Sequence, residues 1–156
     1  MGEVEANRTI LRPTAVVRGT VLMRDIPEFL EHAFTAVADV LARQGVHVTG
    51  PPLALYRSRP GDSVDVEAGF PVAVAITPEG DVRPSIVPGG DAAETVHIGP
   101  YSTLGDAYRK LAEWMERHGR RPAELSWESY LTDPNSPAGP ETLVVWPITG
   151  GDRASG

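Results

Sequence analysis

The chain has 156 residues, of which 41% are hydrophobic and 22% charged, so it is long and apolar enough to bury a core. Its formal net charge of −7 disfavours nucleic acid and anionic membrane surfaces as partners, because both attract basic faces. It contains no cysteine, which excludes disulfides, thiolate metal ligands and cysteine nucleophiles. The first nine residues are polar, and no apolar run reaches the length of a membrane span, so we expect a cytoplasmic protein.

Turn residues and periodic apolar residues divide the first half of the chain into four elements. In chain order we expect a strand at 10–21, a helix between Asp25 and Gly45, and strands at 53–57 and 64–72. Asp25, Pro27 and Glu28 are typical of a helix start, with Asp25 and Glu28 as a capping pair. Gly45 is typical of a helix end. The turn between the last two strands is expected at Pro60-Gly61-Asp62.

The second half repeats this order, which predicts a duplicated fold. We expect a strand at 95–98, a helix capped by Thr103 and ended by Gly119, strands at 127–131 and 142–148, and a turn at Asp133-Pro134-Asn135. Gly119 and Tyr130 lie 74 residues after Gly45 and Tyr56, the constant offset that a duplication produces.

We therefore predict one α+β domain at 10–148, built from two pseudo-symmetric strand-helix-strand-strand repeats. Repeat one covers about 10–76 and repeat two about 83–148, and the connecting segment carries a short strand of its own near 83–87. Residues 1–8 and 150–156 are expected to be flexible tails.

The second half resembles the gyrase-inhibitor-like (GyrI-like) family. The segments that carry this resemblance are His97-Ile98-Gly99-Pro100-Tyr101, then Leu104, Tyr108, Leu111 and Trp114, then Glu128-Ser129-Tyr130-Leu131-Thr132-Asp133-Pro134. The first half agrees more weakly, through Gly19 and residues 65–72, and the whole resemblance covers about 10–148. The family shares its fold with the effector-binding domains of multidrug-responsive transcription activators. The resemblance implies an extended antiparallel sheet with both helices on one face and a ligand groove between the repeats.

The resemblance also implies a site. In the activator relatives, a buried strand glutamate meets lipophilic cations among aromatic rings, and Glu128 matches it by its Glu-x-Tyr context. A second strand glutamate, common in the family, would fall at Leu143, where this chain has no acid. The pseudo-symmetric counterpart of that position is Glu67, whereas the counterpart of Glu128 is Ala54. The chain therefore offers one such carboxylate in each repeat.

Glu128 and Tyr130 are two residues apart on a predicted strand, so their side chains share a face. Tyr56 and Glu67 are expected to reach the same face by pseudo-symmetry. A carboxylate among aromatic rings loses hydration, and a cationic ligand can compensate that loss. The competing interpretation is purely structural: Glu128 accepts hydrogen bonds from Tyr130 or the backbone, and Glu67 is a solvated edge residue.

Other aromatic residues extend the set of candidates. Tyr101 and Trp114 are expected to contact the ligand, while Tyr108 follows the apolar helix stripe and suits the core. Trp127 and Trp146 are predicted to lie on the sheet face opposite the candidate carboxylate.

The remaining motifs exclude several classes of chemistry. The four histidines (His32, His47, His97 and His118) show no HExxH pattern and no clustered acids, so we expect no metal and no cofactor. The sequence also has no phosphate loop, no nucleophile elbow and no helix-turn-helix.

Three functions are left. The first is a stand-alone protein that binds lipophilic, often cationic, drug-like molecules. The alternative is a hydrolase of strained, cyclopropane-bearing electrophiles, which the resemblance implies for some relatives, with Glu128 as general base and Tyr130 or Tyr56 as proton donor. The third, an acidic protein-interaction module, ranks last because the acidic residues are spread along the chain. We favour ligand binding; the sequence specifies neither the ligand nor any protein partner.

Overall fold

The computed structural model describes residues 3–57, 62–132 and 139–149. Its contacts divide the chain into two compact units: Ile10–Gly89, here called the first-repeat unit, and residues up to Thr9 together with those from Gly90 onward, here called the second-repeat unit. The predicted turns at 60–61 and 133–135 and the predicted tail at 150–156 lie outside the described residues.

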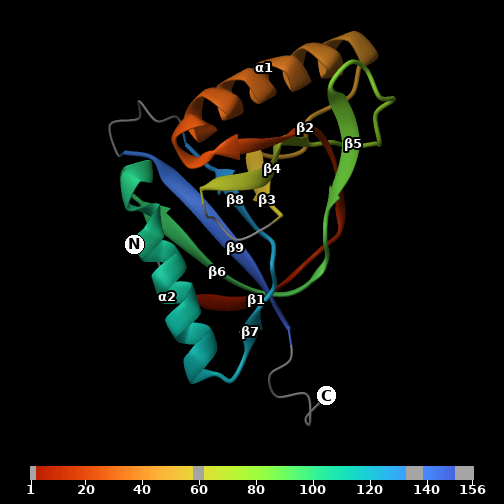
Figure 1. The fold of residues 1–156 in the computed structure, drawn as a ribbon. Helices are drawn as coiled ribbons and strands as arrows, with labels where there is room; N and C mark the ends of the chain where they lie inside the picture. The colour runs from red at the N-terminus through yellow and green to blue at the C-terminus, as the bar shows by residue number, and fades with distance from the viewer. Residues whose placement is uncertain (1–2, 58–61, 133–138, 150–156) are drawn as a thin grey trace. The chain divides into compact units, whose positions relative to one another are not determined.

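The first-repeat unit contains one long helix and an antiparallel sheet. Its elements are β2 (Arg12–Leu22), a 3-10 turn (Met23–Asp25), α1 (Ile26–Gln44), β3 (Leu53–Tyr56), β4 (Ser63–Pro71) and β5 (Val82–Val87). The strands lie in the order β3-β4-β2-β5 (Figure 1). This confirms the predicted strand-helix-strand-strand order, and it places the short strand near 83–87 beside β2.

The helix α1 covers one face of this sheet because its apolar residues recur at helical spacing. Its fully buried side chains pack against strand residues of the same core: Ala33, Val37, Val40 and Leu41 from the helix, and Ala15, Val17 and Ala68 from the strands. Gly45 ends the helix with φ 67°, a left-handed conformation that glycine adopts without strain.

The capping prediction at Asp25 was wrong. The Asp25 side chain makes no capping hydrogen bond, and its backbone is already helical, with φ −96° and ψ 0°. A capping side chain needs an extended backbone to reach the free N–H groups, and the 3-10 turn at Met23–Asp25 removes that geometry.

The second-repeat unit has the same plan with two additions. Its elements are β1 (Glu5–Thr9), β6 (Gly90–Ile98), a 3-10 turn (Tyr101–Thr103), α2 (Leu104–Arg117), β7 (Arg121–Pro122), β8 (Ser126–Tyr130) and β9 (Glu141–Thr149). The strands lie in the order β1-β6-β9-β8, all antiparallel, and the short β7 pairs with the end of β9.

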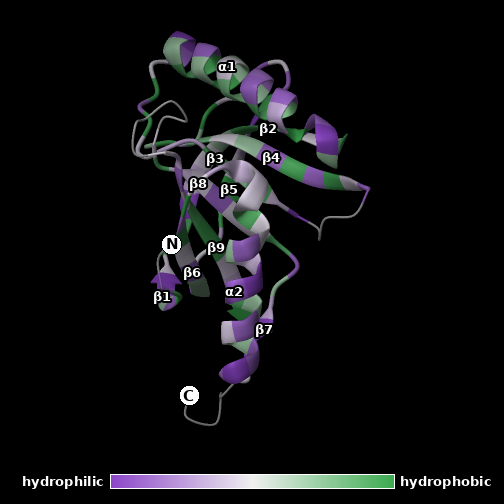
Figure 2. Cartoon of the chain, turned by 90° about the vertical axis from the view of Figure 1, so that its left-hand side faces the viewer, coloured by the Kyte–Doolittle hydropathy of each residue, from purple (hydrophilic) through white to green (hydrophobic). Residues whose placement is uncertain are grey.

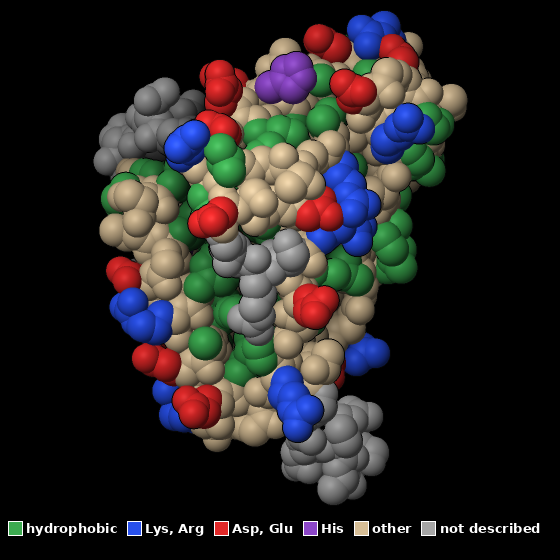
Figure 3. Space-filling model, in the orientation of Figure 1, with side chains coloured by type: hydrophobic (Ala, Val, Ile, Leu, Met, Phe, Trp, Pro, Cys, Tyr) green, Lys and Arg blue, Asp and Glu red, His purple; other side chains and the backbone are tan. Residues whose placement is uncertain are grey.

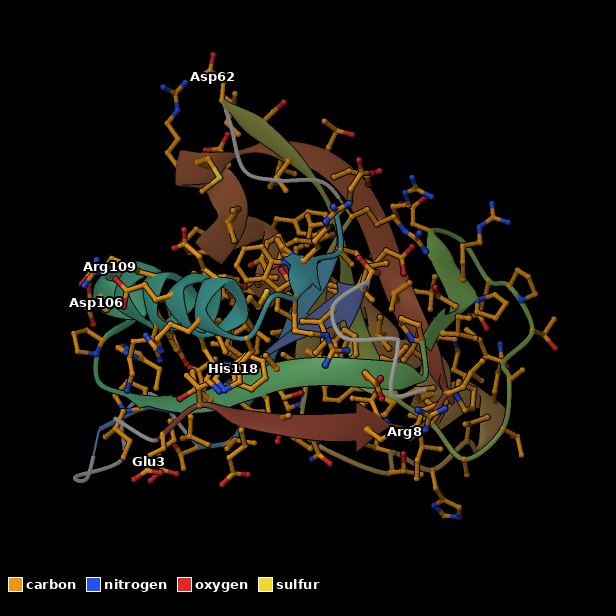
Figure 4. All side chains as sticks on the ribbon, turned by 90° about the horizontal axis from the view of Figure 1, so that it is seen from below. Glu3, Arg8, Asp62, Asp106, Arg109 and His118 are labelled. Atoms are coloured by element: carbon orange, nitrogen blue, oxygen red, sulfur yellow. The ribbon has the colours of Figure 1, made fainter. Side chains whose placement is uncertain are left out.

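Strand β1 corrects the prediction that residues 1–8 form a flexible tail. Residues 5–9 pair with β6, from Glu5 opposite Glu94 to Thr9 opposite Gly90. At one end of β1 the Arg8 guanidinium lies 3.0 Å from an Asp91 carboxylate oxygen (Figure 4). The segment lacks alternating apolar residues, so the sequence carries no strand signal; the backbone groups along the edge of β6 supply the partner instead.

The helix α2 is amphipathic, and Figure 2 shows hydrophobic and hydrophilic residues alternating along it. Its buried residues pack on one face of the sheet: Ala107, Leu111 and Met115 from the helix, and Ala93, Val144, Trp146 and Ile148 from β6 and β9. Near its start Asp106 and Arg109 form an exposed ion pair at 2.9 Å (Figure 4). In the described parts of the chain no helix is long and apolar enough to cross a membrane.

Candidate functional site

The strand register decides which polar side chains share the α2-covered face of the second-repeat unit. Val144 of β9 belongs to the core beneath α2, and its register partner on β8 is Glu128. Thr142, two residues earlier on β9, is opposite Tyr130 on β8 and His97 on β6. Glu128, Tyr130, Thr142 and His97 therefore all lie on the face that α2 covers.

Glu128 is held by two tyrosine hydroxyls. It is only 6% exposed. The Tyr108 hydroxyl donates to its Oε2 at 2.7 Å, and the Tyr130 hydroxyl donates to its Oε1 at 2.8 Å. An ionised carboxylate only accepts hydrogen bonds, so two phenol donors suit its charged form and keep it in one orientation.

Further aromatic rings pack against the two tyrosines that bind this carboxylate. The ring of Tyr101 meets Tyr130 edge-on with centroids 5.8 Å apart, and Tyr108 meets Trp146 edge-on at 5.6 Å. Tyr101 is 40% exposed, so the aromatic set extends from the buried carboxylate to the surface. We call Tyr101, Tyr108, Glu128 and Tyr130 the Glu128 cluster.

The segment before α2 positions Tyr101. Gly99 has φ 140°, a conformation that favours glycine, and its N–H donates to the Pro140 carbonyl at 3.0 Å. The Thr103 hydroxyl donates to the Pro100 carbonyl at 2.9 Å, so the prediction that Thr103 caps α2 was wrong: this hydroxyl closes the preceding turn instead.

Two side chains of this face differ from the sequence expectations. Tyr108 packs against the core beneath α2, as predicted, but its hydroxyl also reaches Glu128, which was not expected from the sequence. The signal for this role is a hydroxyl-bearing residue within an otherwise apolar helix stripe. The predicted position of Trp146 was wrong: Glu128 is opposite Val144, so Trp146 shares its face. Trp127 is opposite Val145 and does lie on the other face.

Glu67 and Tyr56 do not share a face of their own sheet, contrary to expectation. Glu67 is opposite Leu55, whereas Tyr56 is opposite Val66 on the α1-covered face. Glu67 is 4% exposed, and its Oε2 lies 2.5 Å from Nε of Arg57.

The second carboxylate oxygen of Glu67 is also engaged, because the Ser85 hydroxyl donates to Oε1 at 2.7 Å. The guanidinium of Arg57 already compensates the negative charge of Glu67. The ligand-binding roles of Glu67 and Tyr56 stay predictions.

Trp114 lies at a different place on α2. Its ring stacks on His118, just beyond the last turn of the helix, with centroids 4.2 Å apart (Figure 4). It lines a surface pocket of about 240 Å³ whose walls are Glu3, Val4, Lys110, Glu113, Trp114 and Arg117. That pocket includes no residue of the Glu128 cluster, and the ligand contact expected for Trp114 stays a prediction.

A second surface pocket, of about 510 Å³, lies at the start of α1. Its walls are Thr20, Val21, Leu22, Asp25, Glu28, Phe29 and His32. Neither pocket is lined by Glu67 or Glu128. The candidate site is therefore the hydrogen-bonded Glu128 cluster and not either of these surface pockets. Within residues 3–57, 62–132 and 139–149, no three His, Asp or Glu side chains gather as a metal site requires.

Charged side chains of both signs are interspersed on the face that Figure 3 shows. On that face the excess of acidic residues is not gathered into one stripe.

Comparison with known proteins identifies the family to which the chain belongs. Residues 12–149 match the model of the GyrI-like small molecule binding domain, and the chain belongs to this family. The resemblance seen in the sequence is thereby confirmed, as is the α+β fold. No curated protein matches the chain in sequence.

Several solved structures share the fold. The C-terminal domain of EcmrR superposes with a TM-score of 0.84 at 19% identity, covering 96% of this chain and 98% of that one. A hydrolase from Listeria innocua has a TM-score of 0.65 at 15% identity, over 94% and 92% of the two chains. The protein SAV2435, solved bound to tetraphenylphosphonium, has a TM-score of 0.63 at 10% identity, over 95% and 94%. At these identities the similarity shows the fold alone.

Proposed function

We propose that the chain binds lipophilic cationic small molecules at the Glu128 cluster. The observation that carries this proposal is a buried carboxylate held by two phenol hydroxyls within a set of aromatic rings. Phenols stabilise a carboxylate by hydrogen bonding, which favours its negatively charged form. A cation that reached Glu128 would be attracted to a carboxylate that is largely shielded from water, where charge attraction is stronger than at the surface.

The surrounding rings favour the same class of ligand. A cation over a tyrosine or tryptophan face gains about 0.5–2 kcal/mol, more when the contact is shielded from water. Tyr108 and Tyr130 bring two aromatic rings to the carboxylate through their hydroxyls, and Tyr101 packs edge-on with Tyr130. Glu67 has the guanidinium of Arg57 beside it, and the proposal does not depend on Glu67.

The comparisons support the class of function. The family is one of small-molecule binding domains, and one protein of the same fold was solved with tetraphenylphosphonium, a lipophilic cation. The groove that the resemblance implies between the repeats stays a prediction, and the proposal is confined to residues of the second-repeat unit.

A fluorescence titration with rhodamine 6G tests the proposal on three chains: wild type, Glu128→Gln and Glu94→Gln. Glu94 is opposite Val145, on the sheet face away from Glu128, so its variant controls for the loss of one negative charge. We expect saturable binding by wild type and by Glu94→Gln, and a dissociation constant at least tenfold higher for Glu128→Gln, equivalent to about 1.4 kcal/mol.

Equal binding by all three chains would exclude Glu128 as the cation site. Absence of binding by the wild-type chain would remove the proposal and leave hydrolysis of neutral electrophiles as the hypothesis to test.

A further inference from the structure

Two buried polar residues adjoin the Glu128 cluster without a full set of hydrogen bonds. His97 is 2% exposed and Thr142 is 0% exposed. The Nδ1 atom of His97 and the Oγ1 atom of Thr142 are buried and have no hydrogen-bond partner among the described residues. An unsatisfied buried polar atom costs about 1–3 kcal/mol, so two of them on one face require an explanation.

These two residues are neighbours. His97 and Thr142 are register partners on β6 and β9, and Thr142 is in turn the partner of Tyr130 on β8. Directly opposite residues of an antiparallel pair have their Cβ atoms about 4.5–5.5 Å apart. The two unsatisfied atoms and the Tyr130 phenol thus occupy one row across the sheet, next to the row that holds Glu128.

The hydrogen bonds of the Thr103 hydroxyl assign the proton on His97. That hydroxyl donates to the Pro100 carbonyl, so toward His97 it acts as the acceptor. The Nε2 atom of His97 lies 2.9 Å from the Thr103 Oγ1 and therefore carries the hydrogen. In the neutral ring Nδ1 is then an acceptor that needs a donor.

We infer that His97 and Thr142 form a polar subsite that takes a hydroxyl group of the bound ligand. One hydroxyl can donate to His97 Nδ1 and accept from Thr142 Oγ1, which satisfies both atoms at once. A carbonyl cannot donate to Nδ1, so the pair selects against it. The preferred ligand is accordingly a lipophilic cation with a hydroxyl on one of its rings.

This inference rests on the proposed cation site, and a matched pair of probes separates the two. Isothermal titration calorimetry would compare tetraphenylphosphonium with (4-hydroxyphenyl)triphenylphosphonium, which differ by one hydroxyl. Wild type should bind the hydroxylated probe about three- to tenfold more tightly, the size of one added neutral hydrogen bond. Thr142→Val keeps the side-chain shape but has no hydroxyl, so it removes one of the two hydrogen bonds and should reduce this preference.

Two further variants make the result specific. Thr142→Ser restores a hydroxyl and should restore the preference. Thr14→Val makes the same change at a threonine that is 1% exposed in the first-repeat unit, and should keep the wild-type preference.

The outcomes are distinct. Wild-type binding of both probes with equal affinity would overturn the subsite and leave the cation site standing; a water alone, or a direct hydrogen bond between Thr142 and His97, would then satisfy the pair. A preference that is undiminished in Thr142→Val would also overturn it, because the hydroxyl would be bound elsewhere. Binding of neither probe would remove the proposed function itself.

Discussion

Tyr108→Phe tests whether the hydrogen bond between helix and sheet holds the buried carboxylate. The substitution removes one hydroxyl, which donates to Glu128, and keeps the ring that packs edge-on against Trp146. A hydrogen bond to a charged group contributes about 1.5–3 kcal/mol, against about 0.5–1.5 kcal/mol for a neutral pair. Because Glu128 is 6% exposed, water cannot easily replace the lost donor.

We therefore expect Tyr108→Phe to lower the free energy of unfolding by about 1.5–3 kcal/mol. Glu128→Gln should cost less, because it removes a buried charge together with its charge-assisted bonds. The double variant, Tyr108→Phe with Glu128→Gln, should lose about 1 kcal/mol less unfolding free energy than the sum of the two single losses. This difference is the coupling energy between the two side chains, and it is large enough to measure. Urea unfolding followed by tryptophan fluorescence gives all three values, since the chain has three tryptophans.

Additive losses, with a coupling below about 0.5 kcal/mol, would refute the hydrogen bond as the source of the effect. The matched cycle of Tyr108→Phe with Glu94→Gln should be additive, because Glu94 lies on the other face of the same sheet. If that cycle shows the same coupling, the signal reports long-range charge rather than contact.

Two further predictions concern the first-repeat unit and the helix α2. Gly69→Ala should lower stability by more than about 4 kcal/mol in urea unfolding, because the new Cβ would lie 1.8 Å from the backbone oxygen of Ala15. Gly105→Ala should raise stability by about 0.5–1 kcal/mol in the same assay, because Gly105 lies in α2, alanine favours helix, and no atom outside the local helix backbone lies within 4 Å of the new Cβ. Stabilisation by Gly69→Ala or destabilisation by Gly105→Ala would contradict the packing described for these two positions. The hydrogen bond from Arg18 lowers the pKa of Asp65, so Asp65→Asn should cost about 0.2–1 kcal/mol at pH 7 for this partly exposed pair. This cost should begin to fall below about pH 4, where the unfolded carboxyl takes up a proton, and should disappear only once the folded carboxyl, whose pKa is lower, is protonated too; a cost that is constant with pH would refute the pair.

Much of the secondary structure follows from the sequence because its signals are local. The apolar residues of α1 and α2 recur every three or four positions, and only a helical conformation places residues at this spacing on one face that can be buried. Gly45 and Gly119 both take positive φ at the helix ends, where the sequence placed the stops. The offset of 74 residues between these two glycines predicts the duplicated order of elements from the sequence alone.

The content of the site was only partly predictable. Glu128 and Tyr130 share a face because alternation along one strand is a local property, and the structure joins them by a hydrogen bond. Tyr108 was missed because the apolar stripe around it accounts equally well for a core residue. The hydroxyl that donates to Glu128 is identified only when α2 is placed over β8.

Register between strands lies beyond such local signals. Placing Glu128 opposite Val144 rather than Val145 transfers Trp146 to the other face of the sheet, since side chains alternate with a period of two. The same alternation separates Tyr56 from Glu67, and the partner of Glu67 proved to be Arg57. Nothing in the sequence indicates that contact.

The sequence by itself determined the family, the order of helices and strands, and the two residues of β8 that carry the candidate site. Each of these features is determined by the spacing of residues within short segments of the chain, and this spacing does not depend on how the segments pack. Only the tertiary structure decided that Tyr108 donates a hydrogen bond to the carboxylate, that Arg57 pairs with Glu67, and that His97 lies opposite Thr142. Each of these contacts joins separate elements, and the register and packing that create it are set by the burial of whole faces rather than by neighbours in the chain.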